Sequence, residues 1–566
     1  MHFSKIFGRR SSVLLAWLLV GSGILGAYND GAADDLTQTP NEQIAALKAA
    51  LAEQQKQLEA LQKTMEQQQK LLDGALNAQQ SQRPNLGNVA SLSPVVPGPS
   101  TPAAAIPPLA SPKPQRADTS GTSNPCEAGS EGNAVPPYLR LGNVCLVPVG
   151  FMDATTVWRD KNAGSSMGSN FGGVPFNNTV NGNLSEFRFS PQNSRLGLRV
   201  DGDWKGAHFI GYNEFDFNGT SGSSGITVSN GAFVPRLRLF WVDVRKGKIE
   251  FLAGQSWSML TPNRKGISPL PGDLFYSQVI DINYTAGLTW TRQPGLRVLY
   301  HPNEKVTFGL SAEQPDQYIG GSAGGSGITL PSALSTLSGT QLDAANETLA
   351  APTVAPDIIA KIAFDPNAKL HFEVAGIERT FKTANPSLLT QKFTATGGGV
   401  QVGANVQAFK GVRLITTNFW SDGGGRYLFG QAPDLIVRSD GSLSLVHAGG
   451  TVDGVEATIR NTLLYAYYGG VYIGRDSAYD ANGKSLIGYG YTGSPNSQNR
   501  AINELTFGFN QTLWRDPRYG AINVMGQYEW LERDPWFVAL GSPKATHDST
   551  IYFNVRYSLP GSMPNF

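Results

Sequence analysis

Arginine residues recur at alternate positions in stretches whose intervening residues are apolar. The basic and acidic residues that this alternation places on one face are Arg188, Arg195, Arg199, Arg236, Arg238, Arg297, Arg460 and Arg556, with Glu186, Glu214, Asp216, Glu250, Glu456 and Glu529. A guanidinium group presents a planar fork of N–H donors that can hold a carboxylate through two hydrogen bonds. The chemistry that these residues could perform is therefore the weak, reversible binding of small anions.

Residues for covalent or proton-transfer chemistry do not form a comparable set. The six histidines are His2, His208, His301, His371, His447 and His547, and none lies in a recognisable Ser/His or metal-ligand arrangement. We therefore expect no enzyme activity, no cofactor and no metal site.

The segments that carry these charges alternate between apolar and polar side chains. In residues 551–559, Ile551, Phe553 and Val555 fall on one face of a strand, while Asn554 and Arg556 fall on the other. The same alternation recurs in residues 195–201, 306–311, 505–510 and 522–530. The sequence thus predicts strands with one apolar face and one polar face.

Tight polar turns join these strands in pairs, and long loops rich in Gly, Ser and Asn join the pairs to one another. Seven tight turns begin near residues 204, 245, 301, 365, 409, 460 and 515. The long connections lie around residues 159–185, 218–235, 257–284, 314–356, 381–397, 420–453, 475–501 and 532–548. With an opening strand near residues 150–158 and a closing strand at 551–559, sixteen antiparallel strands are expected.

Short turns on one rim and long loops on the other are typical of outer-membrane β-barrels. A soluble sandwich would show the same alternation, with the apolar face in its core. Sixteen strands enclose a lumen too wide for side chains to fill, and the charged inner face suits such a wet interior. We therefore predict an all-β transmembrane barrel, with aromatic belts at the membrane surfaces that include Trp204, Trp241, Trp514, Trp530 and Tyr557.

The N-terminal part of the chain has three segments of different composition. Residues 1–33 combine basic residues with an apolar run, which is typical of a signal peptide; an uncleaved anchor is the alternative. Residues 41–76 carry apolar residues at heptad spacing and predict a coiled coil, which needs partner helices, unless they form a single surface helix. Residues 83–137 are proline-rich and predict a linker to a barrel at residues 148–566.

The charge balance limits the kinds of partner that the chain can bind, and its cysteine content bears on whether a disulfide forms after export. The chain has 45 basic and 44 acidic residues, so we expect no nucleic-acid partner held by bulk electrostatics. Cys126 and Cys145 are the two cysteines, and in an exported chain they predict one disulfide, which would contribute about 3 kcal/mol. Two free, buried thiols are the alternative.

Local motifs and the order of the parts point to one family. The motifs are F-R-F-S-P-Q-N-S-R-L-G-L-R-V at 187–200, E-F-D-F at 214–217, G-Q-S-W-S at 254–258 and Y-A-Y-Y-G-G-V-Y at 465–472. Together with the coiled coil, tether and barrel, they resemble the DcaP-like outer-membrane porins. The chain departs from such barrels at its end, where the last strand stops near Leu559 and Pro-Gly-Ser-Met-Pro-Asn precedes Phe566.

The resemblance implies several properties. The assembly would be a trimer of barrels in the outer membrane of a Gram-negative cell, each barrel with its own pore. The N-terminal helices would form a periplasmic stalk. The solutes would be small anions such as dicarboxylates, helped by arginines inside the channel.

The third long connection, residues 257–284, occupies the place of the loop that commonly folds inward in general porins. It carries Arg264 and Lys265, which we expect to oppose Asp273 and Asp281. Because a pore discriminates at its narrowest part, we predict that this segment is a constriction loop. A loop exposed at the surface is the alternative.

The sequence therefore predicts a passive diffusion channel for small hydrophilic solutes, with a preference for anions. In a first alternative, acids and bases pair across the wall and leave a nearly unselective pore. In a second, the N-terminal rod contacts periplasmic components or peptidoglycan and the chain tethers the envelope; a barrel-wall enzyme such as a phospholipase is the third. The expected partners are outer-membrane lipid, further copies of the chain in a homotrimer, and small anionic or neutral solutes.

Overall fold

The computed structural model describes residues 138–219, 233–275, 278–321, 327–343 and 352–562, together with five residues near the N-terminus. The chain divides into two compact units, Met1–Ser111 and Pro112–Phe566. In the first unit, the described residues are helical and exposed, and none belongs to the predicted apolar seam; they are Lys48, Ala52, Gln55, Lys56 and Lys63. The seam, the predicted signal peptide and the predicted linker lie outside the described residues.

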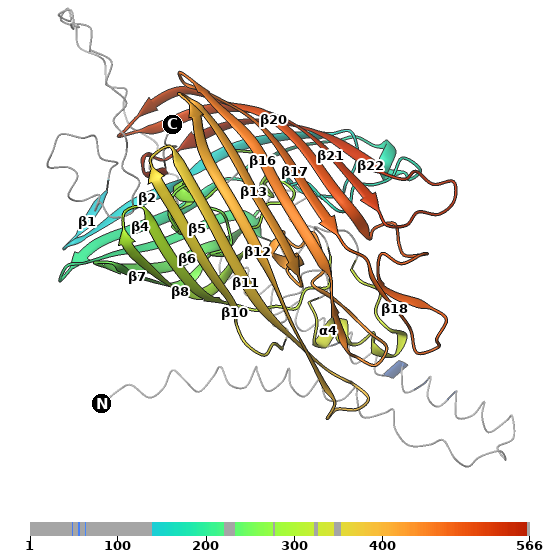
Figure 1. Cartoon of the computed structure of the whole chain (residues 1–566). Coiled ribbons are helices and arrows are strands. Elements are labelled where there is room, and N and C mark those ends of the chain that lie inside the picture. The colour runs from blue at the N-terminus through green and yellow to red at the C-terminus, as the bar shows by residue number, and fades with distance from the viewer. Residues whose placement is uncertain are drawn as a thin grey trace, which may run out of the picture. The chain divides into compact units, whose positions relative to one another are not determined.

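The strands of the second unit form an antiparallel barrel, which Figure 1 shows as long tilted ribbons. Its strands are β2 (Val144–Arg159), β3 (Glu186–Ser190), β4 (Arg195–Trp204), β5 (Ala207–Gly219), β6 (Val234–Lys246), β7 (Ile249–Trp257), β8 (Arg292–Asn303), β9 (Val306–Glu313), β10 (Asp357–Asn367), β11 (Leu370–Ala384), β12 (Lys392–Phe409), β13 (Val412–Asp422), β16 (His447–Ile459), β17 (Thr462–Ile473), β20 (Asn499–Asp516), β21 (Gly520–Pro535) and β22 (Thr546–Ser558).

Pairing between the first and last of these strands closes the barrel. β2 pairs with β22 from Phe151↔Ser558 to Arg159↔Thr550. β3 and β4 pair with successive parts of β2, so together they make one interrupted strand. The barrel therefore has sixteen strands, and the sequence prediction is confirmed.

The remaining elements are short and lie at the ends of the barrel or in its loops. They are β1 (Leu139–Leu141), which pairs with β2, the hairpins β14 (Leu435–Val437) with β15 (Leu443–Leu445) and β18 (Asp476–Tyr479) with β19 (Leu486–Tyr489), the helix α4 (Leu337–Thr340), and the 3-10 turns η3 (Asn181–Asn183), η4 (Pro271–Asp273), η5 (Ser332–Leu334), η6 (Gly425–Tyr427) and η7 (Pro560–Ser562). No helix in the described part of the chain has the length and apolar character that a bilayer crossing needs.

Each of the seven predicted tight turns joins two consecutive strands of the barrel. The predicted long connection at 381–397 is wrong, because β11 runs to Ala384 and β12 begins at Lys392. Gly397, at the end of the predicted connection, instead lies within β12 and pairs with Arg379 of β11. A Cβ at Gly397 would lie 2.4 Å from the carbonyl oxygen of Asp422, so the close approach of two strands requires glycine there.

The two faces of the wall have the polarity that the alternation predicts. In β22, Ile551, Phe553 and Val555 are 48%, 48% and 43% exposed, whereas Asn554 is fully buried. Apolar side chains therefore cover the outside of the barrel and polar side chains point inward, the reverse of a water-soluble sandwich.

One predicted belt residue lies inside the barrel. Trp241 is 4% exposed and stacks on Tyr212, with ring centroids 5.4 Å apart. The prediction failed because the register of β6 against β5 shifts between Leu237 and Leu239. This bulge places Arg236 and Arg238 on the inner face and then Trp241 on the same face.

The last strand of the barrel ends close to the position that the sequence predicts, near Leu559. β22 ends at Ser558, and the backbone N–H of Leu559 donates to the carbonyl of Gly150 at 3.0 Å. Phe566 lies outside the described residues. Cys145 is disulfide-bonded, and its predicted partner Cys126 also lies outside them.

Gly150 tests how tightly the first strands pack. Its φ is +123°, and a Cβ there would lie 2.2 Å from the carbonyl oxygen of Arg195. We predict that Gly150→Val blocks the pairing of β2 with β4, because the strained backbone alone costs roughly 1–3 kcal/mol and the clash adds to it. The measurement is the fraction of protein that shows the faster gel mobility of a folded barrel before heating.

Ala154→Val is the matched control, because Ala154 is exposed on the outer face of the same strand. It should fold like the parent chain. Equal folding of the two variants would contradict the described packing of β2.

Candidate functional site

A long loop lies inside the barrel and contacts its wall. We call residues 258–291, between β7 and β8, the inner loop. Leu260, Ala286 and Leu288 are fully buried. Its polar groups bind inward-facing side chains of strands β9 to β21, so the interpretation as a loop exposed at the surface is excluded.

Carboxylates of the wall hold the backbone of the inner loop. The N–H of Met259 donates to Glu313 at 2.7 Å, that of Asn263 donates to Glu373 at 3.0 Å, and that of Ala286 donates to Glu504 at 2.7 Å. A loop buried inside a barrel has no strand to pair with, so its backbone donors need such acceptors. The sequence analysis missed these acids, although each lies on the polar face of its strand.

Two cations strengthen the attachment. Arg264 of the inner loop donates to both carboxylate oxygens of Glu456 on β16, at 2.7 and 2.9 Å. Lys361 of β10 donates to the carbonyl of Thr261 and to the side chain of Asn263, both at 2.9 Å. The loop is thus fastened by charge-assisted hydrogen bonds, which are stronger than neutral ones.

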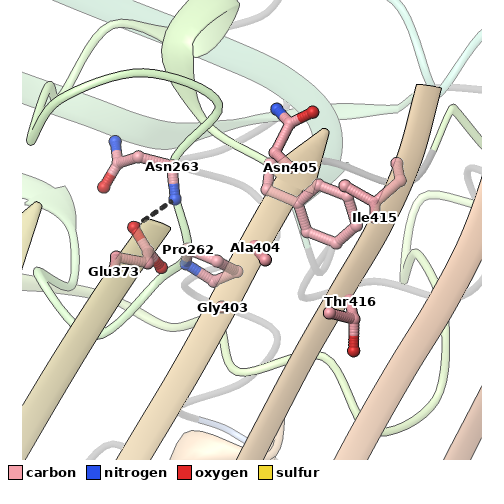
Figure 2. A pocket seen from close by; sticks show the side chains of 9 residues that line it. Pro262, Asn263, Glu373, Gly403, Ala404, Asn405, Ile415 and Thr416 are labelled. Atoms are coloured by element: carbon pink, nitrogen blue, oxygen red, sulfur yellow. Dashed lines mark hydrogen bonds between the residues drawn. The ribbon is translucent and has the colours of Figure 1, made fainter. Parts of the chain in front are cut away.

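Little space is left where the loop meets this wall. Figure 2 shows a cavity between the loop residues Pro262 and Asn263 and the strands β11 to β13, with the N–H of Asn263 directed at Glu373. Its volume of about 10 Å³ holds about one water molecule. The loop and strands β11 to β13 are therefore closely packed at this point.

Arg264 and Asp281 have other partners than those expected, whereas the charge of Lys265 acts on Asp273. Arg264 pairs with the wall rather than opposing the acids of its own loop. Asp273 accepts a hydrogen bond from Ser268 at 2.9 Å, and Asp281 accepts one from the N–H of Ser169 at 2.9 Å. Lys265 is exposed.

The opposite part of the wall, from β22 through β2 to β6, carries the predicted arginines. Five of the ion pairs there have an arginine that is not fully buried: Arg188–Glu186 at 3.2 Å, Arg195–Glu214 at 3.7 Å, Arg199–Asp201 at 2.6 Å, Arg236–Asp216 at 2.6 Å and Arg556–Asp153 at 2.5 Å. We call these five arginines the arginine face. Its arginines lie on β22, β3, β4 and β6, and β2 and β5 between them carry acids of the same pairs. The ion pairs of Arg159 and Arg238 in the same region have buried arginines.

Within the five pairs of the arginine face the arginine is always the more exposed partner. The side-chain exposures are 40% for Arg236 against 1% for Asp216, and 22% for Arg199 against 0% for Asp201. The carboxylates therefore lie behind the guanidinium groups. Although each pair is neutral overall, water beside the arginine face lies nearer to positive than to negative charge.

The other predicted arginines have structural positions. Arg238 is buried between Glu214 and Asp216, at 2.6 and 2.7 Å. Arg297 is buried and donates to the carbonyl of Trp257 at 2.8 Å. The placement of Arg460 on the wall is wrong, because this exposed residue occupies the turn after β16 with a φ of +55°. Among the acids, Glu250 contacts His301 at 2.9 Å, and Glu529 binds Ser169 at 2.9 Å.

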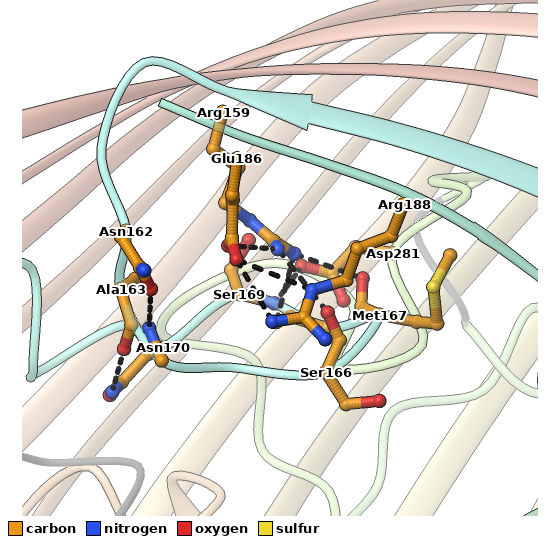
Figure 3. Close-up of polar contacts among 12 residues, drawn as sticks. Arg159, Asn162, Ala163, Ser166, Met167, Ser169, Asn170, Glu186, Arg188 and Asp281 are labelled. Atoms are coloured by element: carbon orange, nitrogen blue, oxygen red, sulfur yellow. Dashed lines mark hydrogen bonds and ion pairs between the residues drawn. The ribbon is translucent and has the colours of Figure 1, made fainter. Parts of the chain in front are cut away.

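Arg159 fastens a second loop, residues 160–185, to the inside of the wall. Figure 3 shows its guanidinium group among Glu186, Met167 and Ser169. It pairs with Glu186 at 2.8 Å and donates to the carbonyls of Met167 and Gly168 at 3.1 and 3.0 Å. The sequence analysis placed this arginine at the start of a loop and gave it no role.

Tyr284 joins the inner loop to the arginine face. Its hydroxyl accepts a hydrogen bond from Arg195 at 2.9 Å, and its ring meets Trp290 edge-on at 4.8 Å. Phe151 lies beside Arg195 and Arg556, with cation-to-ring distances of 5.3 and 3.9 Å. The inner loop therefore contacts this face as well as strands β9 to β21.

Comparison with solved structures identifies the fold. No family model and no curated protein matches the chain. The structure is similar to the outer membrane channel DcaP of Acinetobacter baumannii, with a TM-score of 0.54 and 17% sequence identity over 75% of this chain and 100% of that chain.

Two further similar structures are more distant. An anion-selective porin from Comamonas acidovorans has a TM-score of 0.41 and 12% identity, over 73% of this chain and 99% of that one. OmpF of Salmonella typhi in complex with daunomycin has a TM-score of 0.41 and 10% identity, over 75% and 100%. The fold of this chain is that of a porin-like outer-membrane channel.

Asp273 makes the attachment of the inner loop depend on pH. Burial raises the pKa of its carboxyl from 3.8 to about 6. The native loop therefore binds the proton more tightly than the released loop, so its stability falls as pH rises from about 4 to 6, by about 3 kcal/mol in total. We predict that channel current noise rises over this pH range and that Asp273→Asn reduces the rise.

Asp440→Asn is the matched control, because Asp440 lies exposed in another loop. It should respond to pH like the parent chain. An unchanged pH response in Asp273→Asn would show that Asp273 does not control the loop.

Proposed function

We propose that this protein is an outer-membrane porin that lets small hydrophilic solutes diffuse passively and favours anions. The observation that carries the anion preference is the order of charges on the arginine face, with guanidinium groups toward the lumen and carboxylates behind them. A solute that passes between the inner loop and this face meets positive charge first. Pairing of acids and bases therefore does not by itself make the pore unselective.

The same face suits carboxylates of small organic acids. The side chains of Arg199 and Arg236 are 22% and 40% exposed, and each donates from Nε and Nη2 to an acid that fixes its position. A fixed, partly exposed fork costs little entropy to bind a carboxylate, but the acid behind it keeps that binding weak. Weak and repeated binding is what conduction needs, because a solute must leave as well as enter.

The proposed location and assembly rest on the N-terminal segments and on the apolar outer face of the barrel. The signal-like N-terminus leads to export, and the apolar outer wall fits a bilayer. The heptad segment at residues 41–76 would associate three copies and form a stalk in the periplasm.

The arginine face makes a measurable prediction about selectivity. Arg199→Ala and Arg236→Ala should each lower the anion-to-cation permeability ratio, because each change removes a positive charge and leaves the negative charge of the paired acid unneutralised. A charge about 7 Å from a passing ion in a water-like dielectric changes its energy by about 0.6 kcal/mol, which corresponds to about threefold. The measurement is the zero-current potential of single channels across a salt gradient.

Arg460→Ala is the control, since that arginine lies in a turn outside the wall. Asp201→Asn tests the direction of the effect, because removing the negative charge beside Arg199 should raise the anion-to-cation permeability ratio. An unchanged ratio in both arginine variants would refute the proposed role of this face.

Deletion of residues 41–82 separates conduction from tethering. We predict that the shortened chain keeps its single-channel conductance, because the barrel closes on itself through β2 and β22. It should form fewer stable trimers, since the heptad segment is absent. Loss of envelope integrity with normal trimers would instead favour the tethering function.

A further inference from the structure

Every tight turn of the barrel carries an exposed cation. The seven turns lie at one rim, because each joins a strand to the antiparallel strand that follows it in the chain. We call the exposed cations in and beside these turns the basic rim: Lys205, Lys246, Lys248, Lys305, Lys369, Lys410, Arg460, Arg515 and Arg518. The exposed acids in the same turns are Asp203 and Glu304.

The barrel itself leaves most of this positive charge uncompensated. Asp203 contacts His208 at 3.0 Å rather than a lysine. Apart from Arg515, no cation of the basic rim makes an ion pair with an acid in the described part of the chain. The rim therefore presents positive charge to whatever lies beside it.

Large apolar side chains adjoin the cations on the outer face of the barrel. Trp204, Phe409 and Ile459 each directly precede a cation of the rim and are 66%, 74% and 59% exposed. The ammonium group of Lys205 lies 4.8 Å from the centre of the Trp204 ring. Cations and apolar groups thus alternate along the border of the lipid-facing surface.

Lys246 shows which side of the wall this charge faces. It follows Val242 and Val244 on the outward face of β6, and all three are exposed. Its partner across the hairpin is the exposed Ile249 of β7. Its side chain therefore lies at the end of an apolar column that faces lipid, and not in the lumen.

The lumen side of the same rim is mixed in charge. Glu250 contacts His301 at 2.9 Å, and Asp365 contacts His371 at 2.9 Å. Arg245 faces inward beside them. A solute in the pore therefore meets acids as well as bases at this end, whereas the outer side is predominantly basic.

A cation next to an exposed aromatic ring suits the surface of a bilayer leaflet. Tryptophan and tyrosine rings lie at the level of the lipid head groups. Lysine and arginine side chains lay their stems along apolar surface and extend their charged ends to the phosphate groups. Anionic head groups should bind better than zwitterionic ones, because the latter carry their own cation beside the phosphate.

We propose that the basic rim binds the phosphate groups of anionic phospholipids in the leaflet next to the tight turns. The inference rests on the proposed function, in which the short turns of an outer-membrane porin face the periplasm. Lipids bound in this way would fix the depth of the barrel in the bilayer and surround this rim with anionic head groups.

Spin-labelled lipids test the proposal on the full chain in phosphatidylcholine vesicles. Electron paramagnetic resonance gives the fraction of labelled phosphatidylglycerol and of labelled phosphatidylcholine that the barrel immobilises. We expect phosphatidylglycerol to be preferred about fivefold, which corresponds to roughly 1 kcal/mol for one basic residue near an anionic lipid surface. High salt should weaken this preference.

A variant that combines Lys205→Gln, Lys246→Gln, Lys410→Gln and Arg460→Gln should lose about half of the preference, since cations remain at the other turns. Arg438→Gln with Lys484→Gln is the matched control, because both residues are exposed in long loops at the other rim. It should keep the preference of the parent chain.

Three results would overturn the proposal. One is equal immobilisation of the two lipids by the parent chain. Another is an altered permeability ratio in the four-residue variant with an unchanged lipid preference, which would assign the rim to solutes. The third is binding of the parent chain to isolated peptidoglycan through the same cations without a lipid preference, which would assign the rim to the cell wall.

The proposed function fails by different observations. Labelling of Lys248→Cys in intact cells by a maleimide too large for the pore would refute the periplasmic position of the turns. A parent chain that does not conduct in phosphatidylcholine bilayers would refute the porin function. Both observations are independent of the lipid preference, which requires only the reconstituted barrel.

Discussion

The structure depends on one constraint: polar groups that point into the barrel, and backbone groups of a loop that enters it, must satisfy one another. The inner loop has no neighbouring strand, so its N–H groups bind Glu313, Glu373 and Glu504 of the wall. These acids in turn gain donors that replace water. Loop and wall are therefore stable only together, which fixes the loop inside the barrel.

This mutual attachment divides the interior into two parts with different roles. Strands β9 to β21 use their polar residues to hold the loop, and one cavity between the loop and strands β11 to β13 has a volume of about 10 Å³. Strands β22 to β6 instead carry the arginine face, whose guanidinium groups are partly exposed. We propose that this division leaves a positively charged path on one side of the interior.

The sequence was sufficient to predict the barrel because alternation and turns are local signals. The sixteen strands and the seven tight turns follow from residues close together in the chain, as Ile551 to Val555 illustrate. The strict alternation of inward and outward side chains breaks at the bulge beside Arg238, so Trp241 points inward. It also failed at Arg460, whose place in a turn depends on where β16 ends.

The partners of the inner loop could not be predicted, because they lie far away in the sequence. Arg264 and Glu456 are 192 positions apart, and nothing local to Arg264 distinguishes Glu456 from the loop's own Asp273 or Asp281. The polar face of each strand identified the candidates. Only the closed barrel decided which of them meet.

The central claim is that water in the lumen lies next to the arginine face. Its most direct test is the zero-current potential of the unaltered protein in a planar bilayer that separates two concentrations of potassium chloride. We expect a steady conductance and a potential of the sign that chloride selectivity produces. A potential of the potassium-selective sign, or a bilayer that stays closed to ions, would contradict it.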